Sequence, residues 1–193
     1  MKSLIKQSLL YLNLFGQKIE IGPMKSSPFQ LNIIKARFED NLNRCIVSLN
    51  DNQIGTLTDN SYVDDGYRFH DILHLSFFTF LNWSPVTDSL LGHNELRSLD
   101  NTRAKMREEV LVFLIFDYAQ KHRFLDKSKT IDSKFLDTIL SLSQDFESSH
   151  CSKKEWKRAI LEGFKAWRHV RANNGGNLTF NSKSKQITFS TLL

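Results

Sequence analysis

The spacing of hydrophobic residues divides the chain into strand-like ends and a helical middle. Short apolar runs between residues 29 and 57, interrupted by a polar turn at residues 50–53, predict a small antiparallel meander near the N-terminus. Residues 178–180 and 186–189 alternate between apolar and polar side chains around a second polar turn. This alternation predicts a C-terminal β-hairpin, because successive side chains of a strand point to opposite faces.

In the middle of the chain, apolar residues recur every three to four positions, which is the period of an amphipathic helix. Helices are expected at residues 68–81, 85–91, 101–122, 131–146 and 153–171. Pro85 ends the first helix, because proline disfavours helical backbone at the residue before it, and Asp132 and Ser152 are suitable N-caps for the last two. The run at residues 110–116 is apolar nearly all round, which predicts that the long helix is central and buried.

Together these elements predict an α+β fold that is mostly α: a helical bundle around a central buried helix, with a small N-terminal antiparallel meander and a C-terminal β-hairpin. Breaks at residues 22–23 and 26–28 make residues 1–27 an arm or short helix and residues 28–193 the main domain. Four residues of the arm fall near one helical face and predict a short amphipathic helix: Leu4, Ile5, Leu9 and Leu12. This segment is too short to span a bilayer, so no membrane partner is expected.

The composition restricts the possible binding partners and the cellular setting only slightly. The formal net charge of +5 favours anionic partners such as nucleotides or nucleic acid, although an ordinary basic protein has the same balance. Cys45 and Cys151 lie far apart, without CxxC or zinc-ligand spacing, so a reducing cytoplasm is the expected setting.

A cluster of ionisable residues lies on the otherwise apolar helix at residues 68–81. His70 and His74 are one turn apart, about 40° from each other around the helix axis, and Asp71 is adjacent to His70. Burying such groups without partners is costly, so the cluster requires opposite charges, a divalent cation or a phosphate-bearing ligand. A hydrogen-bonded core network is the alternative interpretation of the same residues.

The long helix offers complementary groups. Glu108 and Glu109 are adjacent, and Lys105 precedes Glu109 by one turn. Asp71, His74, Glu108 and Glu109 are the predicted ligands of a Mg²⁺ or Mn²⁺ ion, and His70 joins them as a predicted catalytic residue. The predicted phosphate-binding residues are Arg68, Arg103, Lys105 and Arg107. The His70-Asp71 pair is also typical of HD phosphohydrolases, but these require a further histidine and aspartate that are not evident here.

Several segments resemble the MazG C-terminal domain family, a domain of MazG-type nucleotide pyrophosphohydrolases. The longest is residues 54–75, which read IGTLTDNSYVDDGYRFHDILHL. Shorter matching segments are residues 82–86, Arg103-Ala104 with Glu108-Glu109, residues 159–164, Arg168 and Gly175-Gly176. The resemblance covers residues from about 29 to 190 and implies a nucleotide-related role.

In this family the domain commonly follows a catalytic MazG domain whose metal site uses ExxE and ExxD pairs, and residues 1–27 are too few to form one. Two functions are therefore expected. The first is a metal-dependent nucleotide pyrophosphohydrolase-like domain that binds a nucleoside triphosphate, as a candidate component of a bacterial stress or phage-defence system. The second is a non-catalytic nucleotide-sensing or scaffold module, with a protein partner on the N-terminal arm. The resemblance also implies a homo-oligomer.

The last predicted helix supports a third interpretation, a nucleic-acid-binding surface. Its basic residues are Lys157, Arg158, Lys165, Arg168 and Arg171, which suit nucleic acid or phosphate but also an ordinary solvated face. Trp156 and Trp167 are expected in the core, and Gly175-Gly176 is expected to stop the helix.

Overall fold

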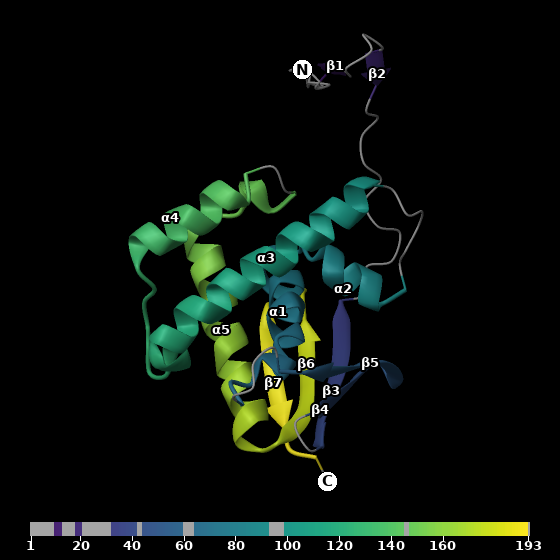
Figure 1. Ribbon diagram of the computed structural model, residues 1–193, viewed down its shortest axis with the longest axis vertical. Coiled ribbons are helices and arrows are strands. Elements are labelled where there is room, and N and C mark those ends of the chain that lie inside the picture. Colours follow the sequence, from purple (N-terminus) through teal and green to yellow (C-terminus); the bar gives the residue numbers. More distant parts are fainter. Residues whose placement is uncertain are drawn as a thin grey trace. The chain divides into compact units, whose positions relative to one another are not determined.

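The chain forms two compact units, Met1–Leu31 and Asn32–Leu193. The computed structural model describes residues 10–12, 18–20, 32–41, 44–59, 64–92, 99–144 and 147–192 (Figure 1). In the first unit, strands β1 (Leu10–Leu12) and β2 (Lys18–Glu20) pair antiparallel. The amphipathic helix expected through Leu12 is therefore wrong at its C-terminal end, and residues 1–9 lie outside the described residues. An isolated helix of about 12 residues is marginal, whereas the hairpin pairs its backbone groups internally.

The second unit contains one antiparallel sheet. Its strands are β3 (Ile33–Asn41), β4 (Arg44–Leu49), β5 (Asn52–Thr58), β6 (Gly175–Asn181) and β7 (Gln186–Ser190), in the spatial order β5-β4-β3-β6-β7. The predicted meander and C-terminal hairpin are both confirmed. The sequence did not indicate that β3 pairs with β6, which joins the meander and the hairpin into a single sheet.

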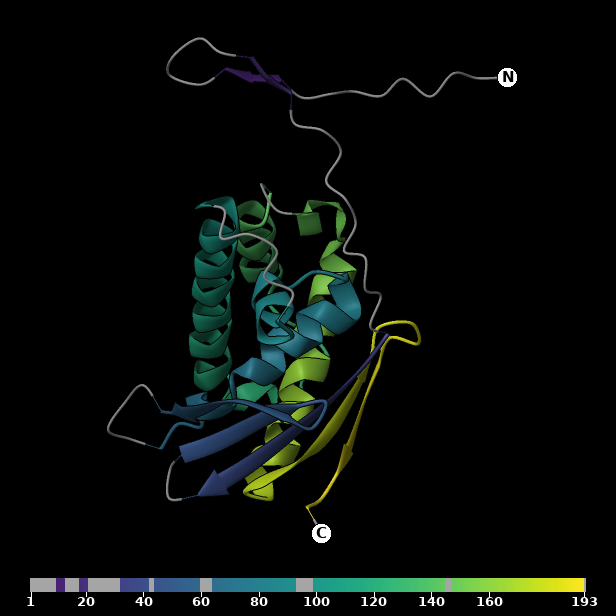
Figure 2. The same cartoon turned by 90° about the vertical axis from the view of Figure 1, so that its right-hand side faces the viewer.

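Helices cover one face of this sheet (Figure 2). Ile34, Ala36 and Phe38 alternate with exposed residues along β3 and are buried, as are Leu178 and Phe180 of β6. Both α1 (Asp71–Leu81) and α5 (Lys153–Ala172) contact β6 and β7. The inward side chains of the sheet and the helices thus share one core.

The remaining helical elements are η1 (Tyr67–Phe69), α2 (Pro85–Leu90), α3 (Leu99–Lys121), η2 (Arg123–Leu125), α4 (Ser133–Leu142) and η3 (Glu147–His150). The chain is 53% helical and 24% strand, which confirms the mostly helical α+β class. The predicted caps are also confirmed. Asp132 accepts a hydrogen bond from the amide of Phe135, and Ser152 forms a capping box with Glu155.

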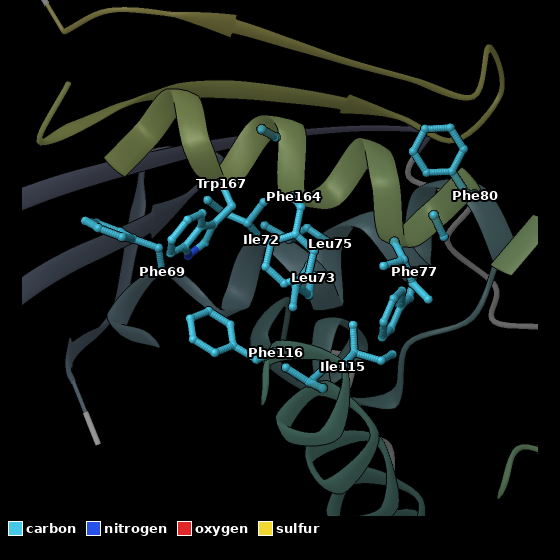
Figure 3. Close-up of a cluster of buried hydrophobic side chains, with 14 of the residues drawn as sticks. Phe69, Ile72, Leu73, Leu75, Phe77, Phe80, Ile115, Phe116, Phe164 and Trp167 are labelled. Atoms are coloured by element: carbon cyan, nitrogen blue, oxygen red, sulfur yellow. The ribbon is translucent and has the colours of Figure 1, made fainter. Parts of the chain in front are cut away.

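The central buried helix is α1 and not the long helix. Every residue of α1 except Phe78 is buried. In contrast, α3 buries one side only, through residues such as Ile115 and Phe116, which point toward α1 and α5 (Figure 3). Val110 is 57% exposed and Phe113 is 54% exposed, so the expectation of an all-round buried helix at residues 110–116 is wrong. Trp156 and Trp167 are buried, as expected. No helix among the described residues combines the length and the apolar content needed to cross a bilayer.

The last helix stops where it was expected to, and the two glycines expected to stop it, Gly175 and Gly176, begin strand β6. Helix α5 ends at Ala172, and Asn173 and Asn174 make the turn. Gly175 has a φ of +129°, and a Cβ atom at this position would overlap the carbonyl oxygen of Phe38 in the neighbouring strand. The position therefore requires glycine for both backbone conformation and close strand approach.

A Gly175→Ala substitution is accordingly expected to lower the free energy of unfolding by about 1–3 kcal/mol, because it adds backbone strain and a clash with Phe38. Urea denaturation measures this change. Gly55→Ala is the matched control: an added Cβ at that strand position meets nothing within 4 Å. If both variants unfold at the wild-type urea concentration, close approach at Gly175 does not matter for stability.

Candidate functional site

The predicted ionisable cluster forms where α1 begins, against the middle of α3. His70 is the N-cap of α1 and Asp71 is its first residue, where the positive end of the helix dipole favours a carboxylate. His70, Asp71 and His74 each offer one ligand atom, and these three atoms all lie within 4.8 Å of one another. The helical spacing of the sequence thus brings the three side chains together as predicted.

Both imidazoles are oriented through Nδ1. His70 Nδ1 lies 2.8 Å from the carbonyl oxygen of Tyr67, and the ring stacks on the Tyr67 ring with centroids 4.4 Å apart. His74 Nδ1 lies 2.7 Å from Glu108 Oε1. An oxygen acceptor at Nδ1 requires the proton there, which leaves Nε2 of each neutral ring as a lone-pair donor.

The two Nε2 atoms face the cluster. His70 Nε2 lies 3.7 Å from Asp71 Oδ1 and 3.8 Å from Glu109 Oε2. His74 is fully buried, and its Nε2 lies 3.3 Å from Glu109 Oε2 but makes no hydrogen bond of acceptable geometry with any described group. A buried polar atom without a partner is costly, so this atom is the most distinctive feature of the site.

Glu108 lies behind His74 and not beside the other ligand atoms. Its side chain is fully buried, and three groups donate to its two oxygens. Oε1 is 2.7 Å from His74 Nδ1 and 2.7 Å from the hydroxyl of Ser84, and Oε2 is 2.8 Å from the amide of Val86. The structure therefore places this predicted metal ligand behind the His74 ring, where it holds the ring in one orientation.

Glu109 is the acidic residue of α3 that reaches the cluster. Its side chain is 46% exposed, in contrast to that of Glu108. Burial raises the pKa of Glu109, but the neighbouring His74 and His70 lower it by more, and the net pKa lies below the ordinary value. A carboxylate that stays ionised and remains accessible suits contact with a cation or a ligand from solvent.

The two histidines have opposite pKa shifts. Burial lowers the pKa of His74, yet the carboxylates of Glu108 and Glu109 outweigh burial and raise it to about 10. Burial also lowers the pKa of His70, and the attraction of Asp71 does not compensate for it. The cluster in isolation therefore pairs a cationic His74 with a neutral His70.

The predicted phosphate-binding residues do not gather at the cluster. The guanidinium of Arg68 is 4% exposed and bonds to Asp40 (3.0 and 2.8 Å), Asp59 (2.5 Å) and Asp64 (2.6 Å). These carboxylates raise the pKa of Arg68 even though burial opposes them. Arg68 thus links Asp40 of β3 to Asp59, which follows β5, and to Asp64, which precedes η1, and it has no surface left for a phosphate.

The other three predicted cations lie on α3. Lys105 is on the same side of the helix as Glu109, one turn before it, and donates to the hydroxyl of Ser89 at 2.7 Å. Arg103 and Arg107 are exposed and lie about 120° and 160° away from Glu109 around the helix axis, at 100° per residue. Lys105 is therefore the predicted phosphate-binding residue that is nearest to the cluster in direction.

Sequence reasoning missed Tyr67, Ser84 and the amide of Val86, which orient His70 and hold Glu108. The sequence did contain a signal for these three residues, because all of them fall within segments that resemble the family, residues 54–75 and 82–86. In the last helix, Arg158, Arg168 and Arg171 each donate to a backbone carbonyl within the chain. These internal contacts weaken the interpretation of that helix as a nucleic-acid surface.

The fold and the cluster together define an α+β domain with two imidazoles and two carboxylates around one helix start. The family model of the MazG C-terminal domain matches residues 20–193. The chain belongs to the MazG C-terminal domain family, which confirms the resemblance of the sequence and places it in a nucleotide-related class of domains. No curated protein and no solved structure matches the chain.

Proposed function

We propose that the domain binds one divalent cation through His70, Asp71, His74 and Glu109 and acts on the phosphates of a nucleotide. The observation that carries this proposal is the buried Nε2 of His74, which has no hydrogen-bond partner among the described residues and faces the other three side chains. With Glu108 fixing Nδ1, the arrangement is that of a carboxylate–histidine pair behind a metal ligand. Family membership supports the nucleotide.

Two nitrogen and two oxygen ligands suit Mn²⁺ better than Mg²⁺, because Mg²⁺ strongly prefers oxygen. A bound cation would supply Lewis acidity toward a phosphoryl oxygen and would acidify a nearby water. Residues of the chain would supply proton transfer and charge stabilisation. The half-exposed Glu109 would bind the cation through one carboxylate oxygen and accept a proton from an attacking water through the other, and Lys105 is the cation best directed to offset phosphate charge.

The test combines cation binding with turnover. Wild-type protein is titrated with Mn²⁺ and with Mg²⁺ by calorimetry, and a panel of nucleoside triphosphates and diphosphates is then assayed for release of phosphate or pyrophosphate. We expect one Mn²⁺ per chain, weaker Mg²⁺ binding and cation-dependent hydrolysis. Absence of both binding and turnover would contradict the proposal. Binding of Mn²⁺ and nucleotide without turnover would leave a nucleotide-binding domain without hydrolase activity.

A non-catalytic scaffold or sensor module is the second candidate. One observation favours it: His74, with its raised pKa, lies between Glu108 and Glu109, so opposite charges satisfy the buried cluster without any cation. Thermal unfolding separates the two candidates. A cation site predicts that Mn²⁺ at 100 times its dissociation constant stabilises the fold by about 2.7 kcal/mol, whereas a structural cluster predicts no Mn²⁺-dependent shift.

Glu108→Gln tests the supporting role of Glu108. The substitution keeps the side-chain volume, but glutamine offers one oxygen where the carboxylate offers two, so it cannot accept from His74, Ser84 and Val86 together. We expect Mn²⁺ affinity to fall about 10- to 100-fold, as is typical when the partner of a ligating histidine is altered. Calorimetry measures the affinity. Asp137→Asn, which changes an exposed carboxylate on α4, is the control and should leave it unchanged.

A further inference from the structure

The outer side of α3 carries a stripe of exposed hydrophobic side chains. Met106 is 65% exposed, Val110 is 57% exposed and Phe113 is 54% exposed. Their spacing of four and three residues places them on one line along the helix, opposite the side that packs on the core. Only Ile33 and Leu142 are comparably exposed large hydrophobic residues in the described part of the chain, and neither belongs to α3.

This stripe lies at the edge of the helical layer. In Figure 2, α3 forms one side of the layer, and the outer side of the helix is not covered by any described element of Asn32–Leu193. Contiguous exposed hydrophobic groups on a helix favour association, because their burial removes apolar surface from water. The stripe is therefore suited to pack against another helix.

Charged residues extend the stripe at both ends. Arg103 precedes Met106 by three residues and Asp117 follows Phe113 by four, so all five positions follow the 3-4 spacing of a coiled-coil seam. The seam begins with a cation and ends with an anion. An antiparallel pair of identical helices would place Arg103 beside the partner's Asp117 at both ends, whereas a parallel pair would place like charges together.

We infer that a second copy of this chain packs on the stripe, with the two α3 helices antiparallel and related by a twofold axis near Val110. This arrangement is isologous, so each patch contacts its own equivalent and the assembly closes as a dimer. Asp117 also accepts a hydrogen bond from Lys121 at 2.7 Å, and this exposed pair leaves the carboxylate free to bond a second cation. The interface borders the cation cluster, because Glu109 immediately precedes Val110.

Three apolar side chains form a small interface, since stable complexes bury roughly 800 Å² on each partner. We therefore expect a concentration-dependent dimer and not a permanent one. Sedimentation velocity of the full chain from low to high micromolar concentration is expected to show a monomer–dimer equilibrium. A single monomeric species at every concentration would overturn the inference, and would indicate that another part of the chain or another protein covers the stripe.

Two apolar-to-polar variants test the surface. Val110→Asp and Phe113→Ser are each expected to raise the dimer dissociation constant by at least about tenfold, because they place polar groups at the centre of the seam. Leu142→Asp is the matched control: it removes a hydrophobic residue of α4 that is 46% exposed and should leave the equilibrium unchanged. A dimer that resists both stripe variants lies on a different surface and refutes the inference.

A charge exchange tests the antiparallel orientation. Arg103→Asp and Asp117→Arg are each expected to weaken the dimer several-fold, because each brings like charges together at both ends. The double variant restores opposite charges and should recover the wild-type constant. No recovery would overturn the antiparallel arrangement. Val110→Cys should also form an oxidised dimer through the twofold axis, against a low background because Cys45 and Cys151 are buried; failure to cross-link would place Val110 away from that axis.

Discussion

Replacing Asp71 with asparagine is expected to abolish Mn²⁺ binding and cation-dependent nucleotide turnover while the domain stays folded. Asp71 contributes one of the three ligand atoms that lie within 4.8 Å of one another, and a neutral amide oxygen binds a divalent cation much more weakly than a carboxylate does. The loss of affinity should exceed the roughly 10- to 100-fold that is typical of a supporting residue such as Glu108. Because the substitution keeps the side-chain shape, the unfolding free energy should change by about 1 kcal/mol or less.

Calorimetric Mn²⁺ titration, turnover assays and urea denaturation of the same Asp71→Asn sample measure the three quantities. Asp137→Asn makes the same chemical change on the exposed surface of α4 and should behave as the wild-type protein does. A folded Asp71→Asn variant that still binds Mn²⁺ with wild-type affinity would remove Asp71 from the proposed site. A variant that loses turnover but keeps its Mn²⁺ affinity would give Asp71 a role other than that of a ligand.

Arg68→Ala is expected to have the largest effect on stability, a loss of about 3–5 kcal/mol in the free energy of unfolding. The side chains of Asp40 and Asp59 are 10% and 7% exposed, so removal of the guanidinium would leave two nearly buried carboxylates without a counter-charge. The third partner, Asp64, is 53% exposed and should contribute little. Such a loss is a large part of the roughly 5–15 kcal/mol that stabilises a domain.

Urea or guanidinium denaturation measures the effect of Arg68→Ala. Arg37→Ala is the control on strand β3, because Arg37 pairs with Glu39 at the solvent-exposed surface and should change stability by roughly 0.5 kcal/mol or less. A change in Arg68→Ala as small as that of the control would show that the aspartates find other partners. Arg68 would then again be a candidate phosphate-binding residue, as the sequence predicted.

The composition of the cluster was accessible from the sequence, whereas the roles within it were not. Helical spacing alone places His70, Asp71 and His74 on one side of α1. The same periodicity brings Glu108 and Glu109 to the partner helix but cannot separate them, because adjacent residues lie only 100° apart. Packing decides that Glu108 is buried behind His74 and that Glu109 faces the cluster.

The role of Arg68 was likewise not predictable from the sequence. Its neighbours in the sequence made it a reasonable phosphate ligand, but Asp40 belongs to a strand 28 residues earlier, and only the folded chain brings the two side chains together. A long-range ion pair leaves no periodic signal in a single sequence. The resemblance to the family singled out residues 54–75. It did not show which of these residues stabilise the fold, as Arg68 does, and which face a ligand.

The sequence by itself determined the local elements of this protein. Hydrophobic period, turn residues and the caps Asp132 and Ser152 specify the meander, the helices and the C-terminal hairpin, because each depends on neighbours within a few residues. Tertiary structure alone decided the pairing of β3 with β6, the exposure of Val110 and Phe113, and the separate positions of Glu108 and Glu109. These features depend on contacts between residues that are more than thirty positions apart in the sequence, and the packing of the whole core decides which of these contacts form.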